Sequence, residues 1–352
     1  MNLGTPILKQ SFTRLRATAT LSIALMACPM AQTPTEQNVF MVGHSLVNFT
    51  MPHMLKSLIA ASGGTGAVDV QVTNGASILA NWENPNSAQG TPYTTALPTG
   101  KYEALVLTEA VPLLNHTTWS NSYQAASQFL GYARGYRSDI RFYIYETWHC
   151  INTGRTDTVI AAIAPRTCWY DNDDGLLWQP RLVADHPKWV KILDSAATLQ
   201  NRHPSSYLIP AGSAFSRLAL EIQAGRVPGL SSFRELFEDD IHPNRLGNWF
   251  VANVIFATLR GRSPEGLARL VNDEYGNRLL EVPQAQATKL QQVAWDAVCA
   301  EPRSGVSCAA TGIGSRHDRN WSSPLRPARL FDAQGRLVRN PQTLVRRLHL
   351  PD

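Results

Sequence analysis

A serine and a histidine far apart in the chain have the surroundings that nucleophilic catalysis requires. Ser45 follows an apolar, strand-forming run at 39–42 and precedes a helical pattern that begins near Pro52. A serine in such a strand–turn–helix lies at the mouth of a helix, where free backbone N–H groups can stabilise a developing negative charge. Ser45 is therefore a candidate nucleophile. The same pattern is also that of an ordinary tight turn or a helix N-cap.

The candidate base is His242, in the sequence Asp239-Asp240-Ile241-His242-Pro243. This is the only Asp-X-X-His in the chain. An acid three residues before a histidine can fix the tautomer of the imidazole and stabilise its charged form. The other ring nitrogen is then available to take a proton from a hydroxyl.

The elements that must position these residues follow from the hydrophobic pattern. Short apolar runs that predict strands alternate with helical patterns. The strands are expected at 38–42, 68–72, 104–107, 140–145 and 206–209, and the main helices at 51–61, 122–136, 187–199 and 244–260. This alternation predicts an α/β domain over 38–308, in which helices cover both faces of a parallel sheet. A long insertion at 150–185 and a basic tail at 309–352 interrupt the pattern, and 329–338 of the tail predicts a small hairpin.

The two chemical motifs together resemble those of the GDSL/SGNH hydrolase superfamily, over roughly residues 38–265. Gly43-His44-Ser45-Leu46 matches the first motif, and the segment at 239–243 matches the last. The resemblance implies a flavodoxin-like three-layer α/β/α sandwich with a five-stranded parallel sheet. It also implies a serine esterase in which Ser45 is the nucleophile, His242 the general base and Asp239 its orienting acid. Asp240 is the alternative for that last role, and no metal or organic cofactor is required.

The same resemblance implies an oxyanion hole built from the backbone N–H groups of Ser45 and Gly75, the glycine of Asn-Gly-Ala-Ser at 74–77. The family's Gly-X-Asn-Asp motif after the third strand is missing, because Thr108 and Glu109 stand there. Thr108 could supply a hydroxyl donor in place of the asparagine. Loss of one donor without a replacement would cost a few kcal/mol of transition-state stabilisation.

Four side chains are expected at the substrate site: His44, Glu109, Trp148 and Trp82. His44 replaces the family's common aspartate and is expected to brace the loop, and Glu109 to shape the site or hold a water. The tryptophans could form a sugar platform or be ordinary core and loop anchors.

The expected substrate is a short-chain acetyl ester on a saccharide. One alternative is a lipase, arylesterase or lysophospholipase of the same mechanism, and another is a glycan-binding surface lipoprotein with a decayed site. The formal charge of +5 over 352 residues does not indicate a nucleic-acid partner.

The N-terminus has the pattern of an export signal. Basic residues at 9, 14 and 16 precede an apolar run at 17–27 that is too short to span a bilayer. Leu-Met-Ala-Cys at 25–28 resembles the lipobox of bacterial lipoproteins, which implies a lipid on Cys28 and attachment to a membrane. The signal peptide is expected at 1–28 and a short polar linker at 29–37, and ordinary cleavage near Ala31 is the alternative to lipidation. The expected location is the periplasm, the outer membrane as a lipoprotein, or the outside of a bacterial cell.

The four remaining cysteines form two local pairs, Cys150 with Cys168 and Cys299 with Cys308. In an oxidising compartment such pairs are expected to close small loops as disulfides. Four free buried thiols are the alternative.

Overall fold

The computed structural model describes residues 1, 37–152, 176–273, 275–308, 330–331 and 337–338. The chain divides into two units, Met1–Thr33 and Pro34–Asp352, and all elements below belong to the second. The predicted signal sequence, Cys28 and most of the linker and of the tail lie outside the described residues. No helix in the described part is both long enough and apolar enough to cross a membrane.

Six strands form the main sheet. Their spatial order is β3 (Gln89–Gly90), β2 (Val68–Val72), β1 (Val39–Gly43), β4 (Ala104–Leu107), β5 (Arg141–Glu146) and β6 (Ser206–Pro210). The last five are parallel, and only the short β3 runs antiparallel to its neighbour. The predicted α/β class and five-stranded parallel sheet are confirmed, with one added edge strand of two residues.

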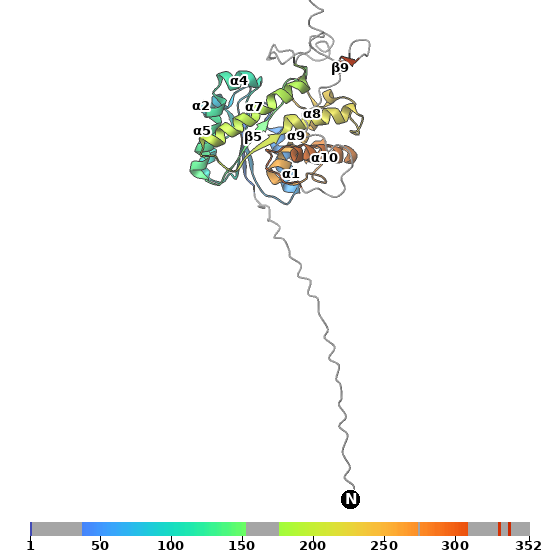
Figure 1. The fold of residues 1–352 in the computed structure, drawn as a ribbon, viewed down its shortest axis with the longest axis horizontal. Helices are drawn as coiled ribbons and strands as arrows, with labels where there is room; N and C mark the ends of the chain where they lie inside the picture. Colours follow the sequence, from blue (N-terminus) through green and yellow to red (C-terminus); the bar gives the residue numbers. More distant parts are fainter. Residues whose placement is uncertain (2–36, 153–175, 274, 309–329, 332–336, 339–352) are drawn as a thin grey trace, which may run out of the picture. The chain divides into compact units, whose positions relative to one another are not determined.

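Helices cover both faces of this sheet, as Figure 1 shows. One face carries α1 (Thr50–Ala61), α8 (Ala211–Gln223), α9 (Arg245–Arg260) and α10 (Gln284–Ala300). The other carries α2 (Ile78–Glu83), α3 (Tyr93–Ala96), α5 (Ser122–Tyr136) and most of α7 (Trp178–Leu199), with α4 (Leu113–Trp119) beside α5 and α7. Two antiparallel pairs complete the described elements: β7 (Leu270–Asn272) with β8 (Arg278–Glu281), and β9 (Leu330–Phe331) with β10 (Leu337–Val338).

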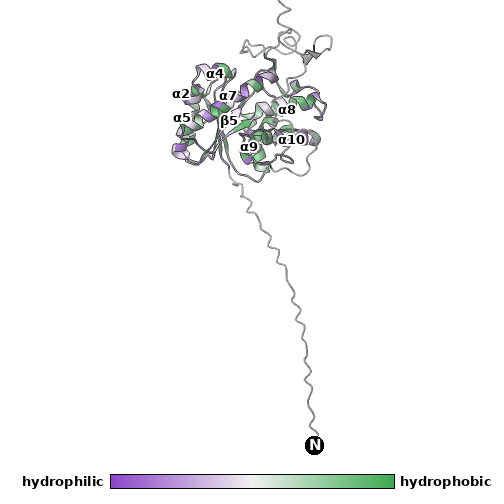
Figure 2. Cartoon of the chain, in the orientation of Figure 1, coloured by the Kyte–Doolittle hydropathy of each residue, from purple (hydrophilic) through white to green (hydrophobic). Residues whose placement is uncertain are grey.

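The central strands are apolar at every position because both of their faces are buried. In β1, Met41 joins the core under α1 and α9, whereas Phe40 joins the core under α5 and α7. Side chains of a strand alternate between the two faces of a sheet, so a strand covered on both sides reads as a continuous hydrophobic run. Figure 2 shows the hydrophobic colour on strands inside the domain and a mixture of hydrophilic and hydrophobic colours on the helices around them.

The order of the five parallel strands is that of a flavodoxin-like, doubly wound sheet. The chain changes direction across the sheet between β1 and β4, which are neighbours in space but not in sequence. Sites in such folds form outside the carboxyl ends of the strands, at this switch point. Ser45 follows β1 and Glu109 follows β4, so both residues come from this edge.

The predicted insertion at 150–185 is wrong at its C-terminal end. Helix α7 already begins at Trp178, with Pro187 inside it, rather than at Pro187. Proline is typical of the first turn of a helix, so Pro187 suggests that a helix begins there, although α7 continues through it. The Trp178 indole donates a hydrogen bond to the His149 carbonyl (2.9 Å), which fixes the start of the helix against the end of β5. Residues 153–175 of the insertion lie outside the described chain.

The prediction of a Cys299–Cys308 disulfide is confirmed, with the two Cα atoms 5.6 Å apart. The loop that it closes runs beside the edge strand β6, where the Leu208 amide donates to the Arg303 carbonyl (2.8 Å). Cys150 is also disulfide-bonded, while Cys168 lies outside the described residues. In the tail, β9 and β10 form an antiparallel pair where the sequence predicts a hairpin.

Candidate active site

The nucleophile turn, residues 43–48, connects β1 to α1. It needs a residue without a side chain at its start, because a Cβ on Gly43 would lie 2.6 Å from methyl groups of both Thr108 and Val47. The chain then reverses through hydrogen bonds from the Val47 and Asn48 amides to the His44 carbonyl (2.8 and 3.4 Å). This tight path leaves Ser45 half-buried at the carboxyl edge of the sheet.

The base loop, residues 238–243, precedes α9. The Glu238 amide donates to the His242 carbonyl (2.9 Å), and the Asn244 side chain caps α9 by accepting from the Leu246 and Gly247 amides. Inside the loop, Oδ1 of Asp239 accepts hydrogen bonds from the amides of Ile241 (2.8 Å) and His242 (2.6 Å). A local aspartate turn therefore fixes both the acid and the histidine.

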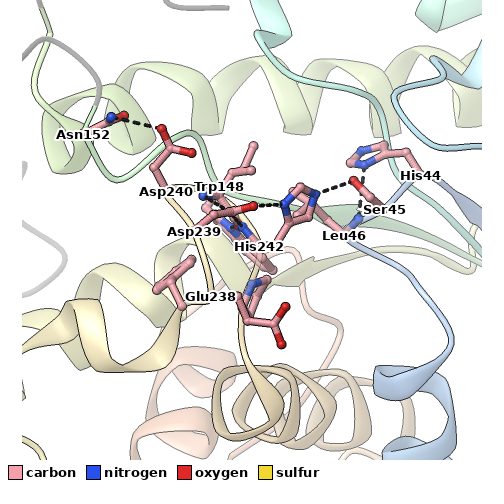
Figure 3. A network of polar contacts seen from close by, with 12 residues as sticks. His44, Ser45, Leu46, Trp148, Asn152, Glu238, Asp239, Asp240 and His242 are labelled. Atoms are coloured by element: carbon pink, nitrogen blue, oxygen red, sulfur yellow. Dashed lines mark hydrogen bonds and ion pairs between the residues drawn. The ribbon is translucent and has the colours of Figure 1, made fainter. Parts of the chain in front are cut away.

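The two turns meet, as Figure 3 shows. His242 Nε2 lies 2.9 Å from Ser45 Oγ, and His242 Nδ1 lies 2.6 Å from Asp239 Oδ2. Burial acts to raise the pKa of Asp239, but the hydrogen bonds from the His242 amide and ring and from the Ile241 amide hold that pKa below its ordinary value. An ionised carboxylate thus faces one nitrogen of the imidazole, and the other nitrogen faces the hydroxyl.

Asp240, the alternative acid, lies elsewhere. Its side chain is buried, and its Oδ2 accepts a hydrogen bond from the side-chain amide of Asn152 (3.0 Å). In Figure 3 this contact lies on the far side of Asp239 from the imidazole. Of the two neighbouring carboxylates, Asp239 is the one in contact with His242.

Both turns are held by side chains from the end of β5. The buried Tyr145 hydroxyl donates to the Leu46 carbonyl (3.3 Å), and the Trp148 indole donates to the Ile241 carbonyl (2.8 Å). Trp148 is only 1% exposed and packs edge-on against Phe215, which corrects the expectation that it contacts substrate. Its position indicates support of the base loop instead.

Trp82, the other tryptophan expected at the substrate site, belongs to an aromatic cluster. Its ring stacks on Tyr93 with the centroids 4.8 Å apart, and it packs edge-on against Phe129 and Tyr132. It is half-buried on α2. These contacts are those of a packing residue rather than of an open sugar platform.

The Gly75 turn lies beside the nucleophile turn. The Thr73 amide donates to the Gly43 carbonyl (3.0 Å), and the turn closes with the Ala76 amide on the Thr73 carbonyl (3.0 Å). Gly75 has φ +70°, a left-handed conformation that favours glycine. Within the described chain, neither the Ser45 amide nor the Gly75 amide donates to another residue. Both predicted backbone donors are therefore available to an incoming oxyanion.

Thr108 and Glu109, which stand where the family's asparagine motif is missing, are both buried, and a donor role for Thr108 stays a prediction. The Thr108 hydroxyl lies 3.5 Å from the Glu109 carbonyl, the limit of a hydrogen bond. Oε1 of Glu109 accepts from the Ile78 amide (3.1 Å) and from the Ala110 amide (2.7 Å). Among the described residues, Oε2 has no partner at good hydrogen-bond geometry, and the nearby Ser122 hydroxyl only moderates the effect of burial. Burial raises the pKa of Glu109 to about 7. The Glu109 side chain is wholly enclosed, so it does not line an open substrate surface. That it shapes the site or holds a water stays a prediction.

His44 makes the bracing contact expected of it. Its Nε2 lies 3.0 Å from the Glu109 carbonyl, and Nδ1 lies within hydrogen-bonding distance of the Leu46 amide (3.4 Å). Burial lowers the pKa of His44 to about 4, so the ring is neutral at physiological pH. A neutral, enclosed imidazole can hold the nucleophile turn, and its role at the substrate site stays a prediction. No cluster of three His, Cys, Asp or Glu side chains among the described residues could hold a metal ion.

No protein-family model matches this sequence, and no curated protein does. Similar solved structures include a DUF4886 family protein from Bacteroides uniformis ATCC 8492, at 15% identity over 77% of this chain and 97% of that one, with a TM-score of 0.49. A provisionally named GDSL-like lipase from Parabacteroides merdae ATCC 43184 has 12% identity over 64% and 95%, with a TM-score of 0.38. The acetyl xylan esterase AlAXEase has 14% identity over 63% and 99%, with a TM-score of 0.39. Similarity this distant carries no conclusion about activity.

Proposed function

We propose that this protein is a serine ester hydrolase of the SGNH type. The observation that supports it is the continuous contact from Ser45 Oγ through the His242 ring to the Asp239 carboxylate, at 2.9 and 2.6 Å. A hydroxyl, an imidazole and an ionised carboxylate in this order are the components of a catalytic triad, which is identified by geometry and not by its place in the sequence.

The reaction follows from these positions. Ser45 Oγ attacks the ester carbonyl carbon while His242 Nε2 takes the hydroxyl proton, and the Ser45 and Gly75 amides bind the oxyanion. The tetrahedral intermediate collapses, and His242 returns its proton to the departing alcohol. Water then attacks the acyl-serine, again giving its proton to His242, which passes it back to Ser45 Oγ as the acid leaves.

For the substrate we propose a short acyl ester, in particular an acetyl ester on a saccharide. The export pattern at 1–28 and the Cys299–Cys308 disulfide favour an oxidising compartment outside the cytoplasm. Carbohydrate esters of the cell envelope or surroundings are accessible to an enzyme in that location. Attachment through a lipid on Cys28 belongs to the same proposal, and an acyl-lipid substrate is its main competitor.

Hydrolysis of p-nitrophenyl acetate tests the activity, with purified wild type, Ser45→Ala and His242→Ala. The matched control is Ser57→Ala, because the Ser57 hydroxyl donates to the His53 carbonyl within α1 and contacts no triad residue in the described part of the chain. We expect both triad variants to lose about 10³-fold or more in kcat, with Ser57→Ala unchanged. Equal rates for wild type and Ser45→Ala would end the proposal. Acetate release from acetylated xylan, compared with fatty-acid release from phospholipid vesicles, then separates the two substrate classes.

A glycan-binding protein with a decayed site is the second candidate. It is favoured by one observation, namely that the end of β4 offers buried Thr108 and Glu109 and no side-chain amide for the oxyanion. This candidate predicts binding of xylo-oligosaccharides in calorimetry together with no Ser45-dependent hydrolysis.

A further inference from the structure

A hydrogen bond between Ser45 and His242 requires the nucleophile turn and the base loop to keep a fixed separation. We propose that Asn48 and Asn248 form a bridge that sets this separation, so that both are positioning residues for the triad. The proposal rests on the proposed hydrolase function. Neither asparagine belongs to a motif that the sequence singles out.

The bridge is a chain of two hydrogen bonds. The Asn48 side-chain amide donates to Asn248 Oδ1 (3.0 Å), and the Asn248 side-chain amide donates to the Pro243 carbonyl (2.8 Å). Asn48 is the third residue after the nucleophile, and Pro243 directly follows the base. The chain therefore starts in one catalytic turn and ends in the other.

Each asparagine is held at its own end. Asn48 has φ +43°, a left-handed conformation that asparagine tolerates better than most residues, and its Oδ1 accepts from the Met51 amide (2.9 Å) in the first turn of α1. Asn248 is buried in the first turn of α9, where its amide also donates to the Asn244 carbonyl (3.1 Å). Neither side chain can rotate without losing a second hydrogen bond, so the bridge is stiff.

This link differs from the supports that β5 provides. Tyr145 and Trp148 attach the two turns separately to β5, through the Leu46 and Ile241 carbonyls. The asparagine pair joins the turns directly, between the starts of α1 and α9, which pack against each other. Removing the pair would leave each turn in place but allow the distance between them to drift. A displacement of about 1 Å at a reacting atom can cost about 100-fold in rate.

The first test is Asn248→Ala against Asn253→Ala. Asn253 is another buried asparagine on the same helix, and within the described chain its side-chain amide donates to the Trp249 carbonyl of α9 (2.8 Å) and to no residue of the base loop. The control thus repeats the loss of an intrahelical hydrogen bond without touching the base loop. In the p-nitrophenyl acetate assay we expect Asn248→Ala to lose about 10- to 100-fold in kcat with KM changed less than about 3-fold. Asn253→Ala should keep both constants, with the thermal unfolding midpoints of the two variants recorded alongside.

A second variant separates positioning from folding. Asn48→Asp keeps the oxygen that accepts from Met51 and tolerates the left-handed backbone, but it cannot donate to Asn248. We expect a loss of kcat similar to that of Asn248→Ala, and a double variant no slower than the slower single one, because both changes break the same link. Additive losses, or wild-type kcat in both single variants, would overturn the bridge. If Asn248→Ala does not fold, Asn48→Asp decides alone.

Crystal structures supply a readout that does not depend on catalysis. We expect the Ser45 Oγ–His242 Nε2 distance to exceed hydrogen-bonding range in Asn248→Ala and to stay unchanged in Asn253→Ala. An unchanged distance in Asn248→Ala would refute the bridge. If wild type itself hydrolyses no ester, the hydrolase proposal fails and this distance still decides whether the asparagines position the two turns.

Discussion

The strongest test of the triad geometry is Asp239→Asn, because the structure dictates which way the new amide must point. Asp239 Oδ1 accepts hydrogen bonds from two backbone amides, at 2.8 and 2.6 Å, while Oδ2 faces His242 Nδ1. An asparagine must keep its oxygen on the two amides, since its NH₂ group cannot accept from them. Its NH₂ group then faces Nδ1, which has to become an acceptor. The ring proton moves to Nε2, the atom that must take the proton from Ser45.

The size of the effect follows from that wrong tautomer. Enforcing it in a serine triad lowers kcat by about 10⁴-fold, which corresponds to about 5.5 kcal/mol of transition-state free energy. Asp239→Ala also removes the carboxylate, but it leaves the imidazole free to adopt either tautomer. We therefore expect Asp239→Asn to be slower than Asp239→Ala, although it is the more conservative substitution.

The assay is steady-state hydrolysis of p-nitrophenyl acetate, with Asp240→Asn as the matched control. Asp240 is the neighbouring carboxylate, is also buried, and contacts Asn152 instead of His242. We expect its kcat to stay within about 3-fold of wild type, in contrast to the loss at the next position. A folded Asp240→Asn protein that loses activity, beside an Asp239→Asn protein that keeps it, would refute the assignment of the acid.

Three further predictions concern residues outside the triad. Burial raises the pKa of Glu109 to about 7, so between pH 4.5 and 7 the folded protein keeps a proton that the unfolded protein releases. The free energy of unfolding should therefore fall by up to about 3 kcal/mol as the pH rises from 4.5 to 7. Glu109→Gln should lack this fall in urea titrations across that range, and parallel profiles would contradict the prediction. Cys308→Ser opens the short disulfide loop and should cost about 2–3 kcal/mol of stability, measured by thermal unfolding; a wild-type midpoint insensitive to reductant would contradict it. Gly43→Ala puts a Cβ 2.6 Å from a Thr108 methyl and should cost about 1–3 kcal/mol, whereas Gly135→Ala, with open space around it, should cost nothing.

The sequence predicts the sheet well because burial on both faces leaves a simple signal. Runs such as Val39–Gly43 and Ala104–Leu107 have no polar interruption, so each strand stands out from the helices around it. The short β3 gives no such signal, because its two residues are held only by pairing with β2. The start of α7 cannot be read from the sequence for a different reason. Residues of α7 before and after Pro187 are buried in the two cores, and this packing keeps the helix continuous through the proline.

In the candidate site, contacts between residues close in sequence could be predicted, and contacts between distant residues could not be predicted from local patterns alone. Asp239 and His242 are close in sequence, so their contact follows from a local turn that a motif can indicate. The contact of His242 with Ser45 required the resemblance to a family, because 197 positions separate them. No local pattern in the sequence indicates Asn48 and Asn248, because they are 200 positions apart and meet only after folding. The prediction that Trp148 lies at the substrate site fails because the sequence around a tryptophan does not distinguish a core position from a sugar-binding one.

In the proposed hydrolase, the position of Glu109 accounts for an oxyanion hole that lacks the asparagine of the GDSL/SGNH motif. Its side chain accepts from the Ile78 amide at the start of α2, just after the Gly75 turn. Its carbonyl accepts from Nε2 of the neutral His44 ring in the nucleophile turn, because Nδ1 of that ring accepts from the Leu46 amide. The two turns that carry the backbone donors are thus tied to one buried residue at the β1/β4 switch point. Preorganised donors stabilise an oxyanion because they need not reorient during the reaction. A residue that never touches the oxyanion can therefore compensate in part for a missing donor, by keeping the two remaining donors rigid.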